Sequence, residues 1–452
     1  MRIVLLSGGS GKRLWPLSND TRSKQFLKLL RAPDGSRESM MQRVYRQIRE
    51  AGISAEITVA ASASQRDSIV SQLGDSVKSV LEPERRDTFP AIVLASAWLL
   101  TEERCSPDEV IAVLPVDPYT ERGYFETIAR MEKAVRDGAA DIVLMGIAPT
   151  YASSKYGYII PGPGKTAEPY PAERFVEKPT EAEAEKLIER GAMWNGGVFA
   201  FKLRYLMEIA RRYVDPADYS GLLARYGELP KISFDYEVVE KAESVAMLPF
   251  DGEWKDLGTW NTLAEEIPEV MGNAVAGEGA ENTHVINELR VPVVVLGVKD
   301  AVVVAGSDGI LVTDKRASAK LKPFVDAAEN HPMYVERLRP MYEERRWGSF
   351  KVIDYGKYSD GVFSLTKHLF IEAGSAISYQ KHSLRDEIWT IVNGTGALLL
   401  DGHVRNVRRG DVAYITAGMK HAIRAVTDLR FIEVQIGEHL AENDIERFEW
   451  EW

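Results

Sequence analysis

The first half of the chain alternates short apolar runs with segments of helical spacing, and this alternation restricts the fold more than any other feature. Runs typical of buried strands occupy residues 2–6, 55–62, 109–117 and 140–147, and helical patterns occupy residues 39–52 and 90–103. Strands that alternate with helices build βαβ units, in which parallel strands form a doubly wound sheet. We therefore predict an α/β domain whose ligand binds beyond the carboxyl ends of the strands.

The pattern of predicted strands and helices changes near residue 265, which indicates that the 452 residues form more than one domain. Residues 272–315 are short β-rich runs separated by glycine and asparagine, a pattern that predicts a small β-helix-like unit. Residues 316–346 are charged and partly helical, and short strands and turns then alternate to the end, as in an all-β barrel. The predicted domains are residues 1–264, 265–335 and 336–452.

Composition excludes some classes of partner. The formal net charge of −11 argues against a general nucleic-acid binder, because such proteins present a basic face. The apolar run near Met1 is too short for a signal peptide, and no stretch of about 20 apolar residues follows. Cys105 is the single cysteine, as is typical of a reducing compartment. We expect a cytoplasmic protein without nucleic-acid or membrane partners, and self-association into a homo-oligomer stays open.

A glycine-rich loop, "LSGGSGKRLWPLS", directly follows the first predicted strand. Glycines let the backbone approach a bulky anion and point N–H groups at it, so the loop predicts a phosphate site. Arg13 and Lys24 can neutralise the charge of a triphosphate. The alternative is a glycine-rich turn beside two solvated cations. The pattern is neither a Walker loop nor G-x-G-x-x-G, so it gives no support to an ATPase or a dehydrogenase.

Together with "KQFL", this loop closely resembles the signature of the sugar-1-phosphate nucleotidylyltransferases, in particular the mannose-1-phosphate guanylyltransferases. "EPERRDTFPAI", "VLPVDPY", "GIAPTYASSKYGYI", "FVEKP", "WNGGVF" and "WKDLGTW" resemble further motifs of the family in the same order. The family usually has a small hydroxyl residue at Lys12, proline at Ser23, asparagine at Asp87 and histidine at Pro118. The resemblance implies a Rossmann-like nucleotidyltransferase domain and extends from residue 1 to about 262, and more loosely to the end.

The resemblance also implies roles for individual residues. The implied catalytic residues are Arg13, Lys24, Asp117 and Asp256. The implied nucleotide-binding residues are Leu6, Gly8, Gly9, Gly11, Arg86 and Asp87. The implied sugar-phosphate-binding residues are Gly157, Tyr158, Glu177, Lys178 and Asn195. Carboxylate oxygens suit Mg²⁺, which Asp117 and Asp256 would hold, although an aspartate at a strand end also often belongs to a turn.

The reaction that the resemblance implies is an in-line transfer of GMP from GTP to mannose 1-phosphate, which yields GDP-mannose and pyrophosphate. Positioning and charge neutralisation would suffice for catalysis, without a covalent enzyme intermediate. Two alternatives stay open. One is a guanylyltransferase for another sugar 1-phosphate, such as a manno-heptose, with a non-catalytic C-terminal domain. The other is a non-catalytic sugar-nucleotide sensor.

A second informative pattern, G-x5-Q-x-H-x4-E-x6-G, begins at Gly374. Positions two apart on a strand share a face, so Gln380 and His382 project together, and Glu387 follows after a short turn. His421 follows a later turn. These four residues are a plausible ligand set for zinc, manganese or iron, and the pattern resembles the two cupin motifs. The alternative is a pair of buried histidines with satisfied hydrogen bonds.

The order of domains resembles the bifunctional guanylyltransferases that carry a type II phosphomannose isomerase at the C-terminus. "RRWGSF" and "ENDIERFE" stand for motifs of that family. Three histidines of its histidine-rich cluster are replaced here, at Ser383, Leu384 and Ile388. We expect their loss to remove polar groups that surround the site. The isomerase activity therefore stays open, with Arg447 as a candidate contact for the substrate's phosphate.

Overall fold

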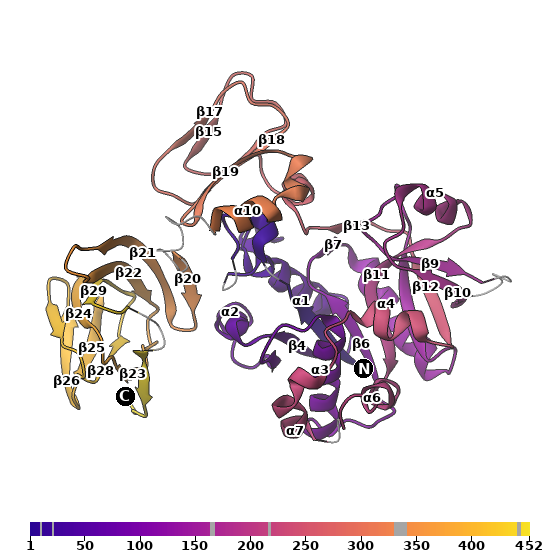
Figure 1. The fold of residues 1–452 in the computed structure, drawn as a ribbon, viewed down its shortest axis with the longest axis horizontal. Coiled ribbons are helices and arrows are strands. Elements are labelled where there is room, and N and C mark those ends of the chain that lie inside the picture. Colours follow the sequence, from indigo (N-terminus) through magenta and orange to yellow (C-terminus); the bar gives the residue numbers. More distant parts are fainter. Residues whose placement is uncertain (10, 20–21, 163–167, 216–217, 330–340, 441–443) are drawn as a thin grey trace. The chain divides into compact units, whose positions relative to one another are not determined.

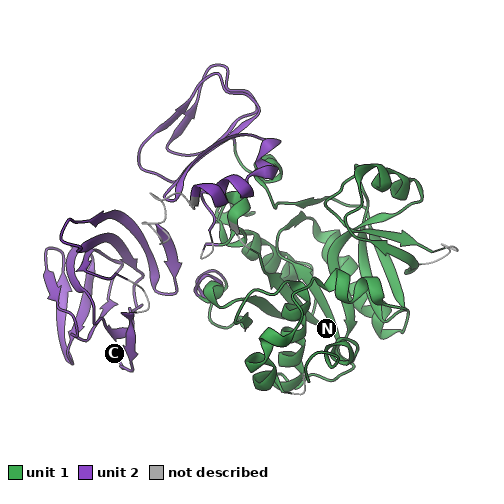
Figure 2. Cartoon of the chain, in the orientation of Figure 1, with its two compact units in different colours: residues 1–14, 23–66, 73–268 green, residues 15–22, 67–72, 269–452 purple. Residues whose placement is uncertain are grey.

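A computed structural model of the chain describes every residue except 10, 20–21, 163–167, 216–217, 330–340 and 441–443 (Figure 1). The chain forms two compact units (Figure 2). Unit 1 comprises residues 1–14, 23–66 and 73–268, and unit 2 comprises residues 15–22, 67–72 and 269–452. The predicted domain boundary at 264/265 stays a prediction, and that at 335/336 falls outside the described residues. Among the described residues, no helix has the length and apolar character needed to cross a membrane.

Unit 1 contains a nine-stranded sheet with helices around it. In spatial order its strands are β5 (Lys78–Glu82), β4 (Glu56–Ser62), β1 (Arg2–Ser7), β6 (Val110–Pro115), β11 (Met193–Lys202), β8 (Ile142–Ile147), β12 (Val245–Phe250), β10 (Tyr170–Val176) and β9 (Tyr158–Pro161). The first four are parallel, as predicted. The sheet as a whole is mixed, because β11 runs antiparallel to both β6 and β8.

Helices cover both faces of this sheet, which confirms the predicted doubly wound α/β fold. Val4 packs in one cluster with the helix after β5, whereas its neighbours Ile3 and Leu5 point to the other face and are equally inaccessible, at 0% exposure. The helices of unit 1 are α1 (Met40–Glu50), α3 (Thr88–Thr101), α4 (Arg122–Arg136), α5 (Glu181–Glu189), α6 (Leu203–Ala210), α7 (Tyr219–Ala224), α8 (Phe234–Glu237) and α9 (Trp260–Leu263), whereas most of α2 (Arg66–Leu73) belongs to unit 2.

Helix α3 fixes one wall of the candidate site. Its residues from Phe89 to Ala97 are all buried, as expected of a helix that is apolar on every side. Asp87 caps the helix, since its side chain accepts a hydrogen bond from the N–H of Thr88 at 2.7 Å. The cap residue has φ +73° and ψ −175°, a backbone conformation that lies outside the left-handed helical region and that glycine adopts far more readily than other residues. Asp87 and Thr88 are thereby held at the edge of the sheet.

Two small antiparallel ribbons complete unit 1. The first pairs β2 (Leu30–Arg31) with β3 (Arg37–Glu38). The second pairs β7 (Pro118–Thr120) with β13 (Trp254–Asp256), and its register places Asp256 opposite Pro118. The N–H of Leu257 donates to the carbonyl of Asp117 at 3.3 Å. This second ribbon therefore brings Asp256 beside Asp117, although the two residues lie far apart in the sequence.

Unit 2 begins its regular structure with a small parallel arrangement, in agreement with the predicted β-helix-like unit. One sheet orders β14 (Val270–Gly272), β16 (His284–Asn287), β18 (Ala301–Gly306) and β19 (Gly309–Asp314), and a second pairs β15 (Ala274–Ala276) with β17 (Val293–Val295). All these pairs are parallel except β18 with β19. Helix α10 (Lys322–Glu329) follows.

The C-terminal part of unit 2 is an all-β fold of two sheets, as predicted. The first sheet orders β20 (Tyr342–Arg345), β21 (Gly348–Lys357), β22 (Phe363–Ile371), β29 (Leu429–Gly437), β24 (Asp386–Asn393) and β27 (Val412–Ile415). The second orders β26 (His403–Arg408), β25 (Thr395–Leu400), β28 (His421–Ala425), β23 (Tyr379–Lys381) and β30 (Glu446–Phe448). Side chains from both sheets, among them Trp389, Leu398 and Phe431, form one core.

Candidate active site and metal centre

The glycine loop begins where β1 ends at Ser7, beyond the carboxyl end of a central strand. Gly9 has φ +110°, a conformation that favours glycine, and nothing lies within 4 Å of the position that a Cβ would take at Gly8 or Gly9. Gly11 opens the 3₁₀ turn Gly11–Leu14, which carries the exposed Arg13. The loop therefore leaves bare backbone facing open space.

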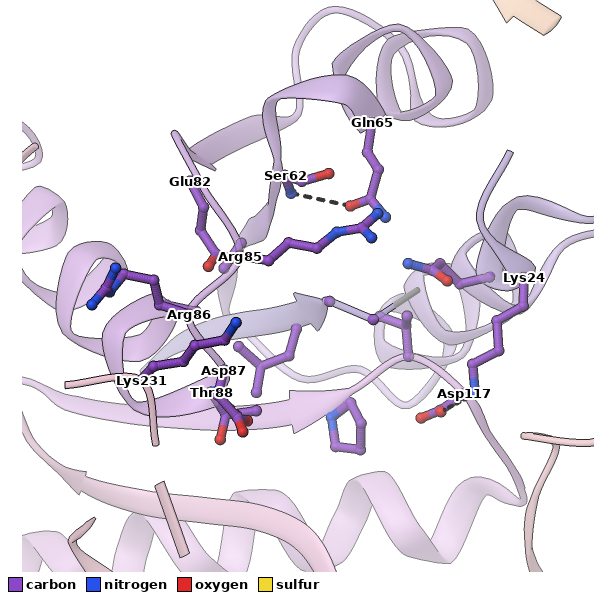
Figure 3. Close-up of a pocket in the computed structure, with 18 residues that line it drawn as sticks. Lys24, Ser62, Gln65, Glu82, Arg85, Arg86, Asp87, Thr88, Asp117 and Lys231 are labelled. Carbon is purple, nitrogen blue, oxygen red and sulfur yellow. Dashed lines mark hydrogen bonds and ion pairs between the residues drawn. The ribbon is translucent and has the colours of Figure 1, made fainter. Parts of the chain in front are cut away.

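A pocket of about 590 Å³ opens beside this loop in unit 1 (Figure 3). Seven predicted residues line it: Leu6, Gly8, Gly9, Lys24, Arg86, Asp87 and Asp117. The sequence interpretation missed the other lining residues, which are Gln25, Ala60, Ser62, Gln65, Glu82, Arg85, Thr88, Ala91, Pro115, Val116 and Lys231. Arg13 and Asp256 are not among the described residues that line the pocket.

Lys24 and Asp117 lie at one end of the pocket (Figure 3), where Lys24 Nζ is 2.6 Å from Asp117 Oδ2. Burial alone lowers the pKa of Lys24, but the carboxylates of Asp117 and Asp256 outweigh it and hold this pKa above its usual value. Lys24 in turn outweighs burial at Asp117 and lowers the pKa of that carboxyl. Burial and the charge of Asp117 raise the pKa of Asp256. The two carboxylates and the ammonium group form one electrostatic cluster, to which exposed Arg13 contributes.

The opposite end of the pocket combines acidic and basic groups from separate elements (Figure 3). Glu82, the last residue of β5, accepts a hydrogen bond from the Tyr226 hydroxyl at 2.7 Å, and burial raises the pKa of its carboxyl. Arg86 donates to the Leu229 carbonyl at 3.0 Å. Arg85 and Lys231 line the same end. Carboxylate acceptors and guanidinium donors are thus available to a ligand that presents both donors and acceptors.

The predicted sugar-phosphate residues come together on the strands β9 to β11. A Cβ at Gly157 would lie 2.4 Å from Glu177 Oε2, so glycine is needed for Glu177 to approach the backbone. Glu177 forms an ion pair with Lys178. Asn195 donates from its main chain to the Gly157 carbonyl at 2.8 Å and from Nδ2 to Asp235 at 2.6 Å. Burial and the charge of Glu177 raise the pKa of Asp235 to about 6, and the sequence interpretation missed this residue.

Tyr158 differs from this group because its side chain points into the domain. The residue is 0% exposed, and its hydroxyl accepts hydrogen bonds from Ser153 N–H and Trp194 Nε1 at 2.9 and 3.0 Å. The same hydroxyl donates to the Ser153 carbonyl at 3.1 Å. A contact with a sugar from this position would therefore come from the main chain.

Four aromatic rings near Asp256 form a cluster that the sequence interpretation did not single out. Trp194 lies 5.0 Å from Tyr151 and 4.9 Å from Tyr156, measured between ring centroids. Tyr156 lies 5.5 Å from Trp254, which opens β13 two residues before Asp256. Burial and the Asp256 carboxylate raise the pKa of Tyr156. The cluster therefore holds an aromatic hydroxyl within electrostatic reach of the Asp256 carboxylate.

In unit 2, His382, Glu387 and His421 converge inside the C-terminal barrel. Their ligand atoms all lie within 4.8 Å of one another. Glu387 Oε1 is 3.2 Å from His382 Nε2, and Glu387 Oε2 is 3.6 Å from His421 Nε2. Burial lowers the pKa of His382 to about 4 and also lowers that of His421, so both imidazoles are neutral at pH 7. Neutral imidazoles and a carboxylate are the forms that bind metal.

The outward nitrogens of both histidines support this arrangement. His382 Nδ1 lies 3.3 Å from the Asp444 carbonyl, and His421 Nδ1 lies 3.0 Å from the Met419 carbonyl. Such bonds fix the tautomer with a lone pair on Nε2, as is usual for metal-binding histidines. His421 Nε2 is buried and has no hydrogen-bond partner among the described residues. This donor set fits a divalent cation.

Gln380 and Arg447 border the same site. Gln380 pairs with His421 on one side and with Arg447 on the other, and directly paired residues project from the same face. Gln380 Nε2 lies 3.4 Å from His382 Nε2, so ligation through Oε1 requires the amide to turn. Arg447 is exposed. Their roles stay predictions.

The replacement of the three histidines does not remove polar groups from the buried site, contrary to expectation. Ser383 and Leu384 are exposed, and their N–H groups bind the Asp444 carboxylate at 2.9–3.1 Å. Ile388 follows Glu387 on a strand and therefore points to the opposite face. The polar groups that surround the metal ligands come from other positions.

Comparison with known proteins matches one family to each of the two main parts of the chain. The family described as Nucleotidyl transferase matches residues 2–272, and that described as Mannose-6-phosphate isomerase C-terminal matches residues 335–450. The chain is 32% identical to mannose-1-phosphate guanylyltransferase ManC of Salmonella typhimurium, over 99% of this chain and 97% of that protein. It is 31% identical to mannose-1-phosphate guanylyltransferase of Escherichia coli, over 98% of this chain and 97% of that protein.

A solved structure from Thermus thermophilus, described as a mannose-1-phosphate geranyltransferase, is 32% identical and has a TM-score of 0.59. The match covers 73% of this chain and 99% of that one. The full-length likeness and both matched families lead to one conclusion. The chain belongs to the mannose-1-phosphate guanylyltransferase family and is an enzyme with a nucleotidyl transferase domain followed by a mannose-6-phosphate isomerase-like cupin domain.

Proposed function

We propose that the chain transfers GMP from GTP to mannose 1-phosphate and releases pyrophosphate. The observation that carries this proposal is the cluster of Lys24, Asp117 and Asp256 beside a pocket whose rim is bare glycine backbone. A screen of nucleoside triphosphates against sugar 1-phosphates, read as released pyrophosphate, tests it. We expect GTP with mannose 1-phosphate to give the highest kcat/KM.

In the proposed reaction, a phosphate oxygen of mannose 1-phosphate attacks the α-phosphorus of GTP. The bond from the α-phosphorus to the oxygen that bridges it to the β-phosphorus breaks, and the electron pair leaves with pyrophosphate. Asp117 and Asp256 would hold Mg²⁺, which would neutralise charge on the phosphates. Lys24 and Arg13 supply fixed positive charge, whose value to catalysis is greatest where negative charge develops in the transition state.

The groups proposed to hydrogen-bond the sugar hydroxyls are Glu177, Asn195 and Asp235. Lys178 is proposed to contact the sugar's phosphate. Buried polar groups discriminate strongly against a partner that leaves them unpaired. A manno-heptose 1-phosphate differs by one hydroxymethyl group, so it stays the second candidate acceptor, and the screen decides between the two. A sensor would bind these ligands and release no pyrophosphate.

We propose that Glu82 and the nearby arginines select guanine. Guanine presents an N2 amino donor together with O6 and N7 acceptors, a pattern that a carboxylate and a guanidinium complement. Glu82 and Arg86 lie at the end of the pocket remote from Lys24, and the Arg85 side chain extends from that end toward Gln65 (Figure 3). A buried carboxylate therefore faces the place where a base would lie.

Replacing Glu82 by glutamine is expected to lower kcat/KM for GTP by about tenfold or more, since such contacts are worth about 1–3 kcal/mol. ITP lacks the N2 amino group, so its kcat/KM is expected to change little. The measurement is the ratio of kcat/KM for GTP to that for ITP. Exposed Glu185→Gln on α5, which makes the same change outside the pocket, serves as the matched control. An unchanged ratio in E82Q removes Glu82 from base selection.

Replacing Gly157 by alanine is expected to raise KM for mannose 1-phosphate by about tenfold or more, since displaced polar groups no longer pair with the sugar. The new methyl group would meet Glu177 Oε2 at 2.4 Å and Phe175 Cζ at 2.5 Å. The GTP pocket does not include this region, so KM for GTP is expected to stay within about twofold of its value. Gly123→Ala, whose methyl group meets only an ordinary contact at 3.4 Å, is the control. Equal rises in both KM values would contradict a role of Gly157 confined to the sugar, and a fall in apparent kcat alone would indicate partial misfolding.

We also propose that the cupin site binds one zinc, manganese or iron ion through His382, Glu387 and His421, with Gln380 as a fourth ligand. Such a metal can polarise the carbonyl and hydroxyl oxygens in an aldose–ketose isomerisation. Elemental analysis and an assay with mannose 6-phosphate test the two parts separately. Turnover supports a bifunctional enzyme, whereas metal without turnover indicates a binding role.

We propose the cytoplasm as the place of action, supported by the unpaired Cys105. Nucleic acid and membrane surfaces are not proposed as partners, in line with the net charge of −11. Self-association into a homo-oligomer is left to measurement.

A further inference from the structure

The cupin site contains a cation of its own, the guanidinium of Arg385. This side chain is 2% exposed, although arginine is seldom fully buried unless paired. Its Nε donates to Glu387 Oε1 at 3.0 Å, and one of its terminal nitrogens lies 3.2 Å from His382 Nε2. Both contacts are made to ligand atoms of the proposed metal site.

The contact with His382 uses the lone pair that a metal would need. Because His382 Nδ1 faces the Asp444 carbonyl, the hydrogen of the neutral ring belongs on Nδ1 and the lone pair on Nε2. The terminal nitrogen of Arg385 carries hydrogens in every state, so it donates to Nε2. One lone pair cannot bind a guanidinium N–H and a metal ion at once.

The charges of the barrel interior lead to the same conclusion. Lys367 and Glu433 form a buried ion pair at 3.7 Å. Glu387 also receives hydrogen bonds from Gln435 and Trp389, both of which are neutral. In the part of the chain that the structure describes, the permanently charged cation paired with Glu387 is Arg385. A divalent metal added beside it would leave an excess of positive charge in a buried site, which is costly.

From these contacts we infer that Arg385 is a built-in competitor of the cupin metal: it occupies the carboxylate and the imidazole lone pair in the metal-free protein and must withdraw when metal binds. The inference rests on the proposed metal site. It makes metal occupancy a property that Arg385 sets.

The test is a Zn²⁺ titration of the full chain against a chromophoric chelator, with Arg385→Gln compared with the unaltered protein. Zn²⁺ binding at the cupin site is measured as the Zn²⁺ that a protein binds in excess of the amount bound by the Glu387→Gln variant. We expect R385Q to bind Zn²⁺ at this site about tenfold more tightly or better, since a competing charged hydrogen bond is removed. Arg424→Gln is the matched control, because it removes the same charge from an exposed position on the strand that carries His421.

Each result decides the inference. Equal or weaker binding by R385Q, with measurable binding by the unaltered protein, overturns the role of Arg385 and leaves the metal site intact. Absence of cupin binding in both overturns the metal site together with the inference. A crystal structure of the unaltered chain with Zn²⁺ bound is a second measurement that needs no variant. We expect the guanidinium to lie beyond hydrogen-bond distance of Glu387 Oε1 and His382 Nε2, and retained contacts would refute the inference.

Discussion

Replacing Asp256 by asparagine is expected to lower kcat of guanylyl transfer by about a hundredfold or more while the fold stays intact. An amide is a much poorer Mg²⁺ ligand than a carboxylate, and loss of one well-placed charge at developing phosphate charge has effects of this size. The substitution preserves shape, and the amide oxygen can still accept the hydrogen bond that Gly258 N–H donates to the Asp256 carboxylate. The fold is spared for this reason.

The measurement is kcat as a function of Mg²⁺ concentration. We expect the Mg²⁺ concentration for half-maximal rate to rise in D256N, because one anionic ligand is lost. Asp251→Asn removes a carboxylate from an exposed position five residues earlier and is expected to behave as the unaltered enzyme. Wild-type turnover of D256N at limiting Mg²⁺ would remove Asp256 from the mechanism.

The elements of the first domain could be predicted because their periodicity is local. Ile3, Val4 and Leu5 are all fully buried, and a short run of this kind is what a strand covered on both faces requires. The direction of a strand within a sheet cannot be predicted from its local sequence pattern, because it depends on the tertiary fold. The sequence from Met193 to Lys202 is compatible with either direction, and β11 runs antiparallel because of where it enters the sheet between β6 and β8.

The candidate site was predictable where its residues follow strand ends and carry unusual chemistry. Asp117 was identified in this way and Lys24 through the motif of the glycine loop, and the structure joins them by an ion pair. Glu82 opens the quoted motif "EPERRDTFPAI" but was assigned no role there. Lys231 was not identified, because it looks like an ordinary charged residue and only the tertiary fold brings it to the pocket.

Arg385 shows the same limit in the barrel. It lies between His382 and Glu387 in the sequence, where a charged residue in a turn would normally be solvated. Nothing local indicates that its side chain turns inward, since its burial depends on the carboxylate it pairs with. The replaced histidines gave the opposite error. Their positions were expected to contribute polar groups to the site, but Ser383 and Leu384 belong to an exposed turn.

Replacing Lys24 by methionine is expected to lower kcat by about a hundredfold, comparable to the loss in D256N, because a fixed positive charge at the transferring phosphoryl group is removed. Methionine approximates the length of the lysine stem, and the side chain is only 14% exposed, so the apolar packing is kept. The effect on Mg²⁺ is expected to have the opposite sign from that of D256N. Lys24 occupies Asp117 Oδ2 at 2.6 Å and repels a cation between the two carboxylates.

Removing the ammonium group frees that oxygen and leaves two facing carboxylates without their counter-ion, so the Mg²⁺ concentration for half-maximal rate is expected to fall in K24M. D256N and K24M are thus both expected to lose kcat, but the Mg²⁺ concentration for half-maximal rate is expected to rise in D256N and to fall in K24M. This difference distinguishes a metal ligand from a cation that competes with the metal. Exposed Lys28→Met, with the same change four residues later, is expected to alter neither quantity. A rise in the Mg²⁺ requirement of K24M would mean that Lys24 organises the carboxylates for the metal, because competition for Asp117 predicts only a fall.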